Sequence, residues 1–199
     1  MAAKRRDEPV VLSSIYTRTG DDGSTALADG SRAAKTDSRL AAYADVEEAN
    51  CAIGVALALG KPDAAVTALL TRIQNELFDV GADLANPVSD EPPPYPPLRI
   101  DQSYIGALEA ACDQWNADLP VLRSFLLPGG TAAAALLHTA RVVTRRAERS
   151  AWAAVAEHGA SVNPLAAQYL NRLSDLLFIL CRVVNAGAGD VLWKPGGER

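Results

Sequence analysis

The 199-residue sequence lacks the features that mark several classes of protein. Its three cysteines are widely spaced without a Cys-x-x-Cys pair, and it has only two histidines, which argues against a disulfide framework and a zinc site. No apolar run approaches the roughly 20 residues that cross a bilayer. The N-terminal charges precede no apolar segment of the kind found in secretory signals. With a formal net charge of −5, the chain also lacks the basic surface that nucleic acid requires. These absences predict a cytoplasmic protein that binds neither membrane nor nucleic acid.

Alanine and leucine are abundant instead, and the apolar residues recur at helical spacing. No period-2 run is long enough to suggest a sheet, so the sequence predicts an all-α protein, a five-helix up-and-down bundle. The helices are expected from Asp37 to about Leu59, from near Asp63 to Asn86, through Ile105, Leu108, Cys112 and Trp115, from about Thr131 to His158, and from Asn163–Pro164 to about Val184. We expect one domain over residues 1–199, with flexible tails at 1–14 and about 188–199 and an extended proline-rich connection at 89–99.

The fourth expected helix carries most of the chemistry that the sequence shows. Four arginines surround one glutamate, a local charge of +3 in an acidic chain: Arg141, Arg145, Arg146 and Arg149 around Glu148. Guanidinium groups gathered in this way are suited to bind an anion, phosphate in particular. A solvated helix face stabilised by i,i+4 ion pairs explains the run equally well. His138 lies one turn before Arg141, where packing is the simpler role.

An N-terminal loop is rich in glycine, hydroxyl groups and carboxylates. Its nine residues are Thr17, Arg18, Thr19, Gly20, Asp21, Asp22, Gly23, Ser24 and Thr25. Glycines let backbone amides approach phosphates, and the two aspartates are suited to hold Mg²⁺. The loop does not follow the Walker A pattern, and Gly-Asp-Asp-Gly is also a common turn. We expect a flexible loop that becomes ordered when it binds a phosphate-bearing ligand.

Two further helices place polar residues where apolar ones are expected. Glu47 and Asn50 share one face of the first helix, and Asn171 and Ser174 lie among the leucines of the fifth. An interior polar face is costly unless its groups are paired. Simple exposure at the bundle surface explains each pair more economically, on spacing alone, than a role in ligand binding.

Five segments together resemble the PduO-type ATP:cob(I)alamin adenosyltransferases. They are IYTRTGDDGST, SRAAKTDSRLAAYADVEEAN, FLLPGGT, HTARVVTRRAER and YLNRLSDLLF, in the family's order between Ile15 and about Val184. The resemblance implies a homotrimeric five-helix bundle with active sites between subunits. It implies transfer of the 5′-deoxyadenosyl group of ATP to the cobalt of cob(I)alamin, which releases triphosphate. A carrier that delivers adenosylcobalamin without turnover is the alternative. A flavoprotein reductase and an adenosylcobalamin-dependent mutase are the implied protein partners.

The resemblance also implies roles for individual residues. The loop from Thr17 to Thr25 would bind MgATP together with Lys35, Arg145, Arg146, Glu148, Arg149 and Asn171. Phe125 would lie under the corrin ring, and Arg141 would pair with the acidic residue of the first helix, here Glu47.

Two positions depart from the family's usual pattern. Glu47 stands in V-E-E-A-N where V-D-E-L-N is typical, and Asp22 stands where a lysine is frequent. The second change removes a possible phosphate contact, while the arginine set is complete. We therefore expect adenosyltransferase activity, with altered nucleotide affinity or metal binding at the loop.

Overall fold

The computed structural model describes residues 15–89 and 96–196. The predicted tail at 1–14, residues 90–95 of the proline-rich connection and residues 197–199 lie outside the described residues. Residues 188–196, expected to belong to a flexible C-terminal tail, make defined contacts that are described below. Their flexibility stays a prediction.

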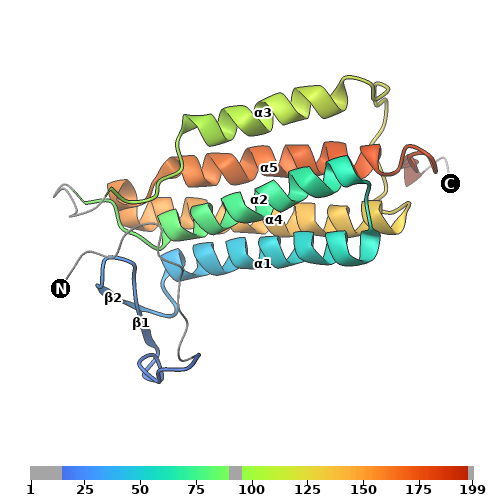
Figure 1. Cartoon of the computed structure of the whole chain (residues 1–199). Helices are drawn as coiled ribbons and strands as arrows, with labels where there is room; N and C mark the ends of the chain where they lie inside the picture. The colour runs from blue at the N-terminus through green and yellow to red at the C-terminus, as the bar shows by residue number, and fades with distance from the viewer. Residues whose placement is uncertain (1–14, 90–95, 197–199) are drawn as a thin grey trace.

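Five long α-helices form the described chain, as the sequence predicts (Figure 1). They are α1 (Ser38–Gly60), α2 (Ala64–Leu84), α3 (Gln102–Asn116), α4 (Ala132–His158) and α5 (Pro164–Val183), with a short 3₁₀ turn, η1 (Gly159–Ser161), between the last two. The expected helix starts at Asp37, Asp63, Thr131 and Asn163 are confirmed. Each of these residues is an N-cap whose side chain accepts a hydrogen bond from a backbone amide of the first turn.

The helices pack side by side with α4 in the middle. α1 and α5 lie against α4, α2 covers α1, and α3 covers α5 (Figure 1). Alanines on α4 such as Ala140 and Ala147 are fully buried, and small side chains of this kind let neighbouring helices approach closely. Of the cysteines, Cys181 is buried, and burial raises its pKa to about 12. Cys112 is half-buried, whereas Cys51 is exposed although apolar residues follow it in the sequence.

A small hairpin precedes α1 and was not predicted. β1 (Ser24–Ala26) pairs antiparallel with β2 (Arg32–Ala34), with Thr25 opposite Ala33. Strands of three residues are too short for alternating hydrophobicity to be visible in the sequence. The hairpin turn places Gly30 at φ 86°, a left-handed conformation that glycine adopts without strain.

A buried carboxylate joins three segments at the hairpin end of the bundle. Asp83 on α2 is only 2% exposed, and it accepts hydrogen bonds from the amide of Ile100 at 2.8 Å and from Asn163 Nδ2 at 2.6 Å. Arg99 Nη1 forms an ion pair with it at 2.6 Å. The carboxylate thereby ties the chain after the proline-rich connection to the start of α5.

Replacing Asp83 by alanine should lower the free energy of unfolding by about 3–5 kcal/mol. The change removes the partner of the half-buried Arg99 and the acceptor of the Ile100 amide and of Asn163. Asp113→Ala, at an exposed position on α3, should change the free energy of unfolding by less than about 0.5 kcal/mol. Urea unfolding at a fixed protein concentration measures both. Equal losses in the two variants would contradict this role of Asp83.

Candidate functional site

The N-terminal loop of Thr17–Thr25 lies on the surface beside the hairpin, and its residues are exposed or half-buried. Asp22 accepts hydrogen bonds from the amide of Ser24 at 2.9 Å and from Ser24 Oγ at 2.7 Å, and these bonds lower the pKa of the Asp22 carboxyl. Arg32 from β2 donates to the carbonyl oxygen of Thr19 at 2.9 Å and forms an ion pair with Asp22 at 3.5 Å. The Asp22 carboxylate is therefore used within the loop itself.

Lys35 reaches the same loop from the end of the hairpin. Its backbone amide donates to the carbonyl oxygen of Gly23 at 2.9 Å, and its side chain crosses over Gly20. A Cβ added at Gly20 would lie 3.1 Å from Lys35 Nζ and 3.0 Å from the carbonyl oxygen of Ser24, so a larger residue does not fit there without a shift. The structure thus places an ammonium group directly over a glycine turn. Asp21 has no ion-pair partner among the described residues.

The arginines of α4 divide between two edges of the helix. Arg141 lies with its guanidinium carbon 5.9 Å from the ring centroid of Phe178 on α5, and Glu148 accepts a hydrogen bond from Asn171 Nδ2, also on α5, at 3.0 Å. These contacts place Arg141 and Glu148 on one face, as their spacing predicts. Arg146 lies on the opposite edge, where it pairs with Glu48 and, at 3.5 Å, with Asp45 of α1. Hydrogen bonding to Glu48 raises the pKa of Arg146.

This arrangement distinguishes the two explanations of the arginine run. Arg146 is part of a helix-to-helix ion-pair network and does not lie with the other arginines. Arg145 and Arg149 are exposed and form no ion pair within the part of the chain that the structure describes. Arg141 is half-buried, and its Nε has no hydrogen-bond partner there. A face stabilised by ion pairs would pair these groups, so three unpaired guanidinium groups in an acidic chain favour an anion site.

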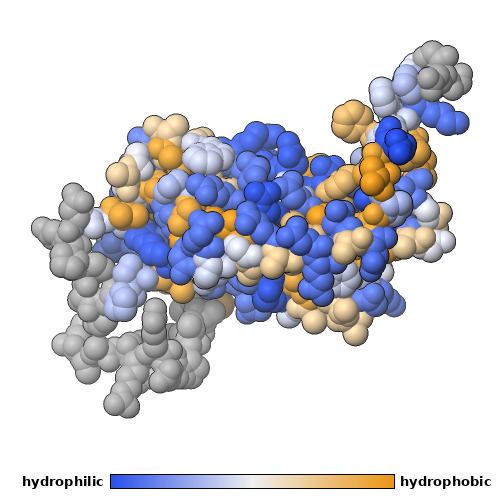
Figure 2. Space-filling view, turned by 90° about the horizontal axis from the view of Figure 1, so that it is seen from above, coloured by the Kyte–Doolittle hydropathy of each residue, from blue (hydrophilic) through white to orange (hydrophobic). Residues whose placement is uncertain are grey.

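An aromatic cavity lies beyond the N-terminal end of α4. It has a volume of about 990 Å³ and is lined by Phe125, Arg141, Phe178, Leu192, Trp193 and Lys194 among others. The Phe125 ring is 79% exposed and meets Trp193 edge-on, with ring centroids 6.2 Å apart. Figure 2 shows apolar side chains gathered at the base of the projecting C-terminal segment. A large exposed apolar surface of this kind indicates a binding site.

Sequence reasoning identified Phe125 and Arg141 but missed two residues of this cavity. Phe178 stands in the segment YLNRLSDLLF, where it looked like one more core residue. Trp193 was assigned to the C-terminal tail. The available signal was a tryptophan preceded by two apolar residues, Val191 and Leu192, in an otherwise glycine-rich end.

His138 packs against Phe178, one of the residues that line this cavity. It is 6% exposed and meets the ring of Phe178 edge-on at 6.4 Å, which is the packing role that the sequence favours. Burial, and then the charge of Arg141, lower the pKa of His138. Its Nδ1 has no hydrogen-bond partner among the described residues. His138 therefore packs against a cavity-lining ring, and its surroundings disfavour the charged imidazolium.

Glu47 does not meet Arg141 within the chain. Glu47 is exposed and lines a separate groove of about 360 Å³ between α1 and α2, together with Tyr43, Asn50 and Phe78. Asn50 donates to the carbonyl oxygen of Gln74 at 2.9 Å, so its amide serves to join the two helices. The ion pair that the resemblance implies is thus absent from a single described chain.

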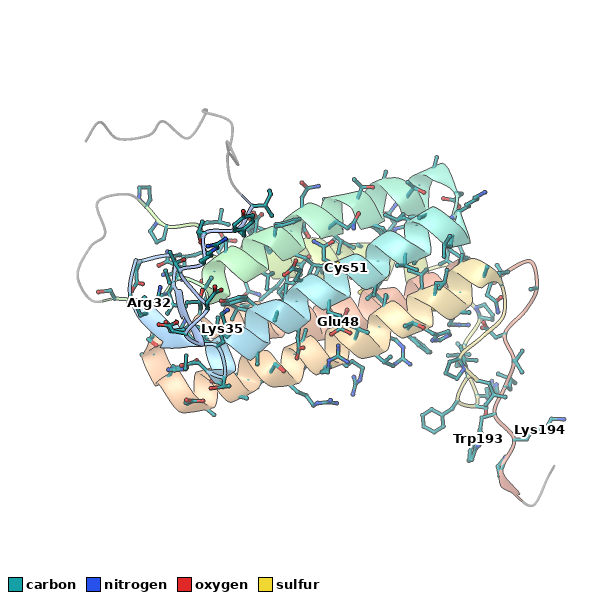
Figure 3. All side chains as sticks on the ribbon, turned by 90° about the horizontal axis from the view of Figure 1, so that it is seen from below. Arg32, Lys35, Glu48, Cys51, Trp193 and Lys194 are labelled. Carbon is teal, nitrogen blue, oxygen red and sulfur yellow. The ribbon has the colours of Figure 1, made fainter. Side chains whose placement is uncertain are left out.

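The loop and the aromatic cavity lie at opposite ends of the bundle. In Figure 3, Arg32 and Lys35 lie at one end, and Trp193 and Lys194 at the other. α4 joins the two ends, since His158 at its C-terminus lies 2.8 Å from Asp37 beside the hairpin, while Thr131 at its N-terminus follows the segment of Phe125. The 27 residues of α4 span about 40 Å. The loop and the aromatic cavity therefore lie toward opposite ends of the bundle in a single chain.

The sequence predicts that no segment crosses a membrane. Within residues 15–89 and 96–196, no helix combines the length and apolar character needed to cross a bilayer.

Comparison with known proteins identifies the family. The family model described as Cobalamin adenosyltransferase matches residues 15–184. The Corrinoid adenosyltransferase of Mycobacterium tuberculosis (strain ATCC 25618 / H37Rv) is 65% identical over 190 residues, which cover 96% of this chain and 97% of that protein. The Corrinoid adenosyltransferase of Bacillus subtilis (strain 168) is 43% identical over 185 residues, or 90% of this chain and 92% of that protein.

Solved structures agree with the sequence relatives. A variant PduO-type ATP:corrinoid adenosyltransferase from Lactobacillus reuteri, complexed with cobalamin and ATP, superposes with a TM-score of 0.81 at 34% identity, over 91% of this chain and 99% of that one. A second variant complexed with ATP gives a TM-score of 0.78 at 33% identity, over 90% and 100% of the two chains. With its helices, its loop and its arginine face all inside the matched region, the chain belongs to the PduO-type corrinoid adenosyltransferase family.

Proposed function

We propose that this protein is an ATP:corrinoid adenosyltransferase, which transfers the 5′-deoxyadenosyl group of ATP to the cobalt of cob(I)alamin and releases triphosphate. The observation that carries the proposal is the continuity of two surfaces on α4. The aromatic cavity holds Arg141 at its edge, and the unpaired guanidinium groups of Arg145 and Arg149 follow along the helix. An apolar macrocycle fits the first surface and a polyphosphate fits the second.

The reaction needs orientation and charge stabilisation more than acid–base catalysis. Cobalt(I) is a strong nucleophile, and its electron pair forms the new bond to the ribose C5′. The C5′–O bond breaks, and its electrons leave with the triphosphate. The protein must hold C5′ in line with the cobalt and stabilise the charge on the leaving group. Arg145, Arg149 and Lys35 supply positive charge for the second task.

Phe125 suits the preceding reduction step. Reduction of cobalt(II) is hard while an axial ligand stabilises the oxidised metal. An exposed ring held by Trp193 can occupy the space under the corrin, exclude water and keep the lower ligand away. Loss of an axial ligand raises the reduction potential, by the general dependence of a metal's potential on its ligation.

The loop residues fit MgATP as substrate. Mg²⁺ binds through one or two carboxylates together with phosphate oxygens. The Asp21 carboxylate is exposed and unpaired within the described chain, whereas Asp22 is held by Ser24 and Arg32. Asp21 is thus the residue that would contact the ion. The glycine turn at Gly20 and the ammonium group of Lys35 would bind the phosphates, and we expect the loop to become ordered around them.

A complete site requires at least two chains, and we propose the homotrimer that the family resemblance implies. The loop lies at the C-terminal end of α4 and the aromatic cavity beside its N-terminal part, yet the transferred carbon must touch cobalt. In a cyclic trimer, the loop of one protomer can face the arginines and Phe125 of the next. The Glu47–Arg141 pair then also forms between protomers, which explains why it is absent from the single chain.

The remaining proposals concern the domain, the cellular compartment and the protein partners. We propose that residues 1–199 act as one domain in the cytoplasm. A flavoprotein reductase would supply the electron that makes cob(I)alamin, and an adenosylcobalamin-dependent mutase would receive the product. The reduced cysteines of the sequence suit this compartment.

Turnover tests the activity directly. With ATP, cobalamin and a chemical reductant, the protein should form adenosylcobalamin and triphosphate in equal amounts through many cycles per site. Absorbance follows the corrinoid, and phosphorus NMR follows the triphosphate. Binding without product beyond one equivalent would identify a carrier instead of an enzyme.

Mixing two inactive variants tests the shared site. Lys35→Ala and Arg141→Ala should each lose activity, since each removes a charge from one half of every site. Refolding them together in equal amounts should restore roughly a quarter of wild-type activity, because about one site in four then combines the two intact halves. No recovery in mixtures that do form mixed trimers would place both residues in a site within one chain.

Arg145→Ala should weaken ATP binding and turnover by about 10- to 100-fold without lowering stability, because an exposed guanidinium that meets phosphate contributes binding and not packing. Arg72→Ala is the matched control, since Arg72 on α2 is similarly exposed but pairs with Glu76. Calorimetry with ATP and thermal unfolding measure the two effects. Unchanged affinity in Arg145→Ala would show that the arginine face is only solvated.

A further inference from the structure

The segment that carries Phe125 is held in place by the C-terminal strap, defined as residues 190–193. Leu126 and Leu192 form an antiparallel bridge. The amide of Leu127 donates to the carbonyl oxygen of Val191 at 2.8 Å, and the amide of Trp193 donates to the carbonyl oxygen of Phe125 at 2.7 Å. The backbone of Phe125 is therefore fixed by a short ladder to residues near the end of the chain.

Apolar burial contributes little to holding this strap. Val191, Leu192 and Trp193 are 53%, 47% and 42% exposed. Two exposed strands without further partners have little stability of their own in water. The strap must therefore be anchored at its root, where the buried polar groups lie.

One guanidinium group holds both strands of the ladder. Arg182, in the last turn of α5, is 5% exposed. Its Nε donates to Asp190 Oδ2 at 3.0 Å, at the start of the strap, and its Nη2 donates to the carbonyl oxygen of Pro120 at 2.6 Å, at the start of the segment that leads to Phe125. A buried arginine with these two partners is a clamp between two chain segments that have no helix of their own.

A second anchor connects the strap to the start of α4. Asn185 is 4% exposed, its Oδ1 accepts from the amide of Thr131 at 2.9 Å, and its Nδ2 donates to the carbonyl oxygen of Gly189 at 2.7 Å. Asn185 fixes the direction in which the chain leaves α5. Arg182 and Asp190 then decide whether the strap reaches Phe125.

We propose that Arg182 and Asp190 are positioning residues for the corrinoid reaction: their ion pair holds the strap, and through it Phe125 and Trp193, at the aromatic cavity. The inference rests on the proposed placement of the corrin over Phe125. Without the pair, the strap loses its root, and the Phe125 ring is no longer held in the position that excludes a lower axial ligand. ATP binding depends on the loop and on the arginines of α4, so it does not depend on this pair.

Asp190→Asn is the variant of choice, because the Asp190 side chain is 21% exposed. Arg182 is buried, so a replacement of Arg182 risks misfolding. Asp118→Asn, at an exposed position ahead of Pro120, is the matched control for charge. Asp190→Glu keeps the carboxylate and should restore the wild-type behaviour in large part.

The first measurement needs no ligand. Hydrogen exchange of the Leu127 and Trp193 amides, followed by NMR, should be about 10-fold faster or more in Asp190→Asn than in wild type, with amides in the middle of α4 unchanged. Unchanged exchange at these two amides would overturn the clamp. Faster exchange throughout the bundle would also overturn it, since the pair would then be a general contributor to stability.

The second measurement uses cob(II)alamin and ATP. Asp190→Asn should form less four-coordinate cob(II)alamin, seen in its absorbance spectrum, and should raise the KM for cobalamin about 10-fold with the KM for ATP unchanged. If the amides exchange faster but cobalamin binding and its spectrum do not change, the strap does not position the corrin site and the inference is wrong. Failure of wild-type turnover would instead refute the proposed function, while the ligand-free exchange result would still stand.

Discussion

The length and rigidity of α4 constrain everything else in this molecule. Its 27 residues separate the hairpin end from the Phe125 end by about 40 Å, and α1 and α5 pack along its sides (Figure 1). A helix held on two sides cannot bend to bring its ends together. The proposed reaction joins a nucleotide bound at the loop to a corrinoid bound at the aromatic cavity, and it then requires more than one chain. Otherwise one of the two surfaces serves another purpose.

Charge is distributed along α4 in a way that fits the first possibility. Arg146 stabilises the bundle through Asp45 and Glu48 of α1. Arg145 and Arg149, within one turn of it, have no carboxylate partner in the described chain. Arg145 and Arg146 thus have different surroundings, because a step of one residue along the helix turns the side chain from the α1 interface to the open surface. The aromatic end is built differently, with polar anchors at the root and exposed rings at the tip.

Much of the fold could be predicted from the sequence because its signals are local. Helix caps such as Asp37 and Thr131, Pro164 at the start of α5 and the apolar stripe of α2 all report on nearby backbone. The β1–β2 hairpin could not be predicted, since three-residue strands carry no visible alternation. The role of Trp193 was missed for a different reason: its partner Phe125 lies far away in the sequence, and periodicity says nothing of such pairs.

The candidate site could also be predicted only in part from the sequence. The motifs single out the loop, the arginines, Phe125 and Asn171, whose roles stay predictions. The spacing correctly places Arg141 and Glu148 on one face. Spacing did not show that Arg146 turns toward α1, because that depends on acidic residues of another helix. It did not show that Glu47 and Arg141 lie in different cavities, because that depends on how α2 covers α1.

Pulsed electron paramagnetic resonance gives the most direct test of the central claim, that the hairpin end of one chain meets the aromatic end of another. A nitroxide at Thr36→Cys, beside Lys35, can be paired with the unpaired electron of bound cob(II)alamin in the presence of ATP, after Cys51→Ser removes the exposed native thiol. The account predicts a shortest label-to-cobalt distance well below about 25 Å, the length of α4 between Arg141, which lines the cavity, and His158 beside the hairpin. A shortest distance at or above that length would mean that the loop and the aromatic cavity never meet, and the shared active site would be wrong.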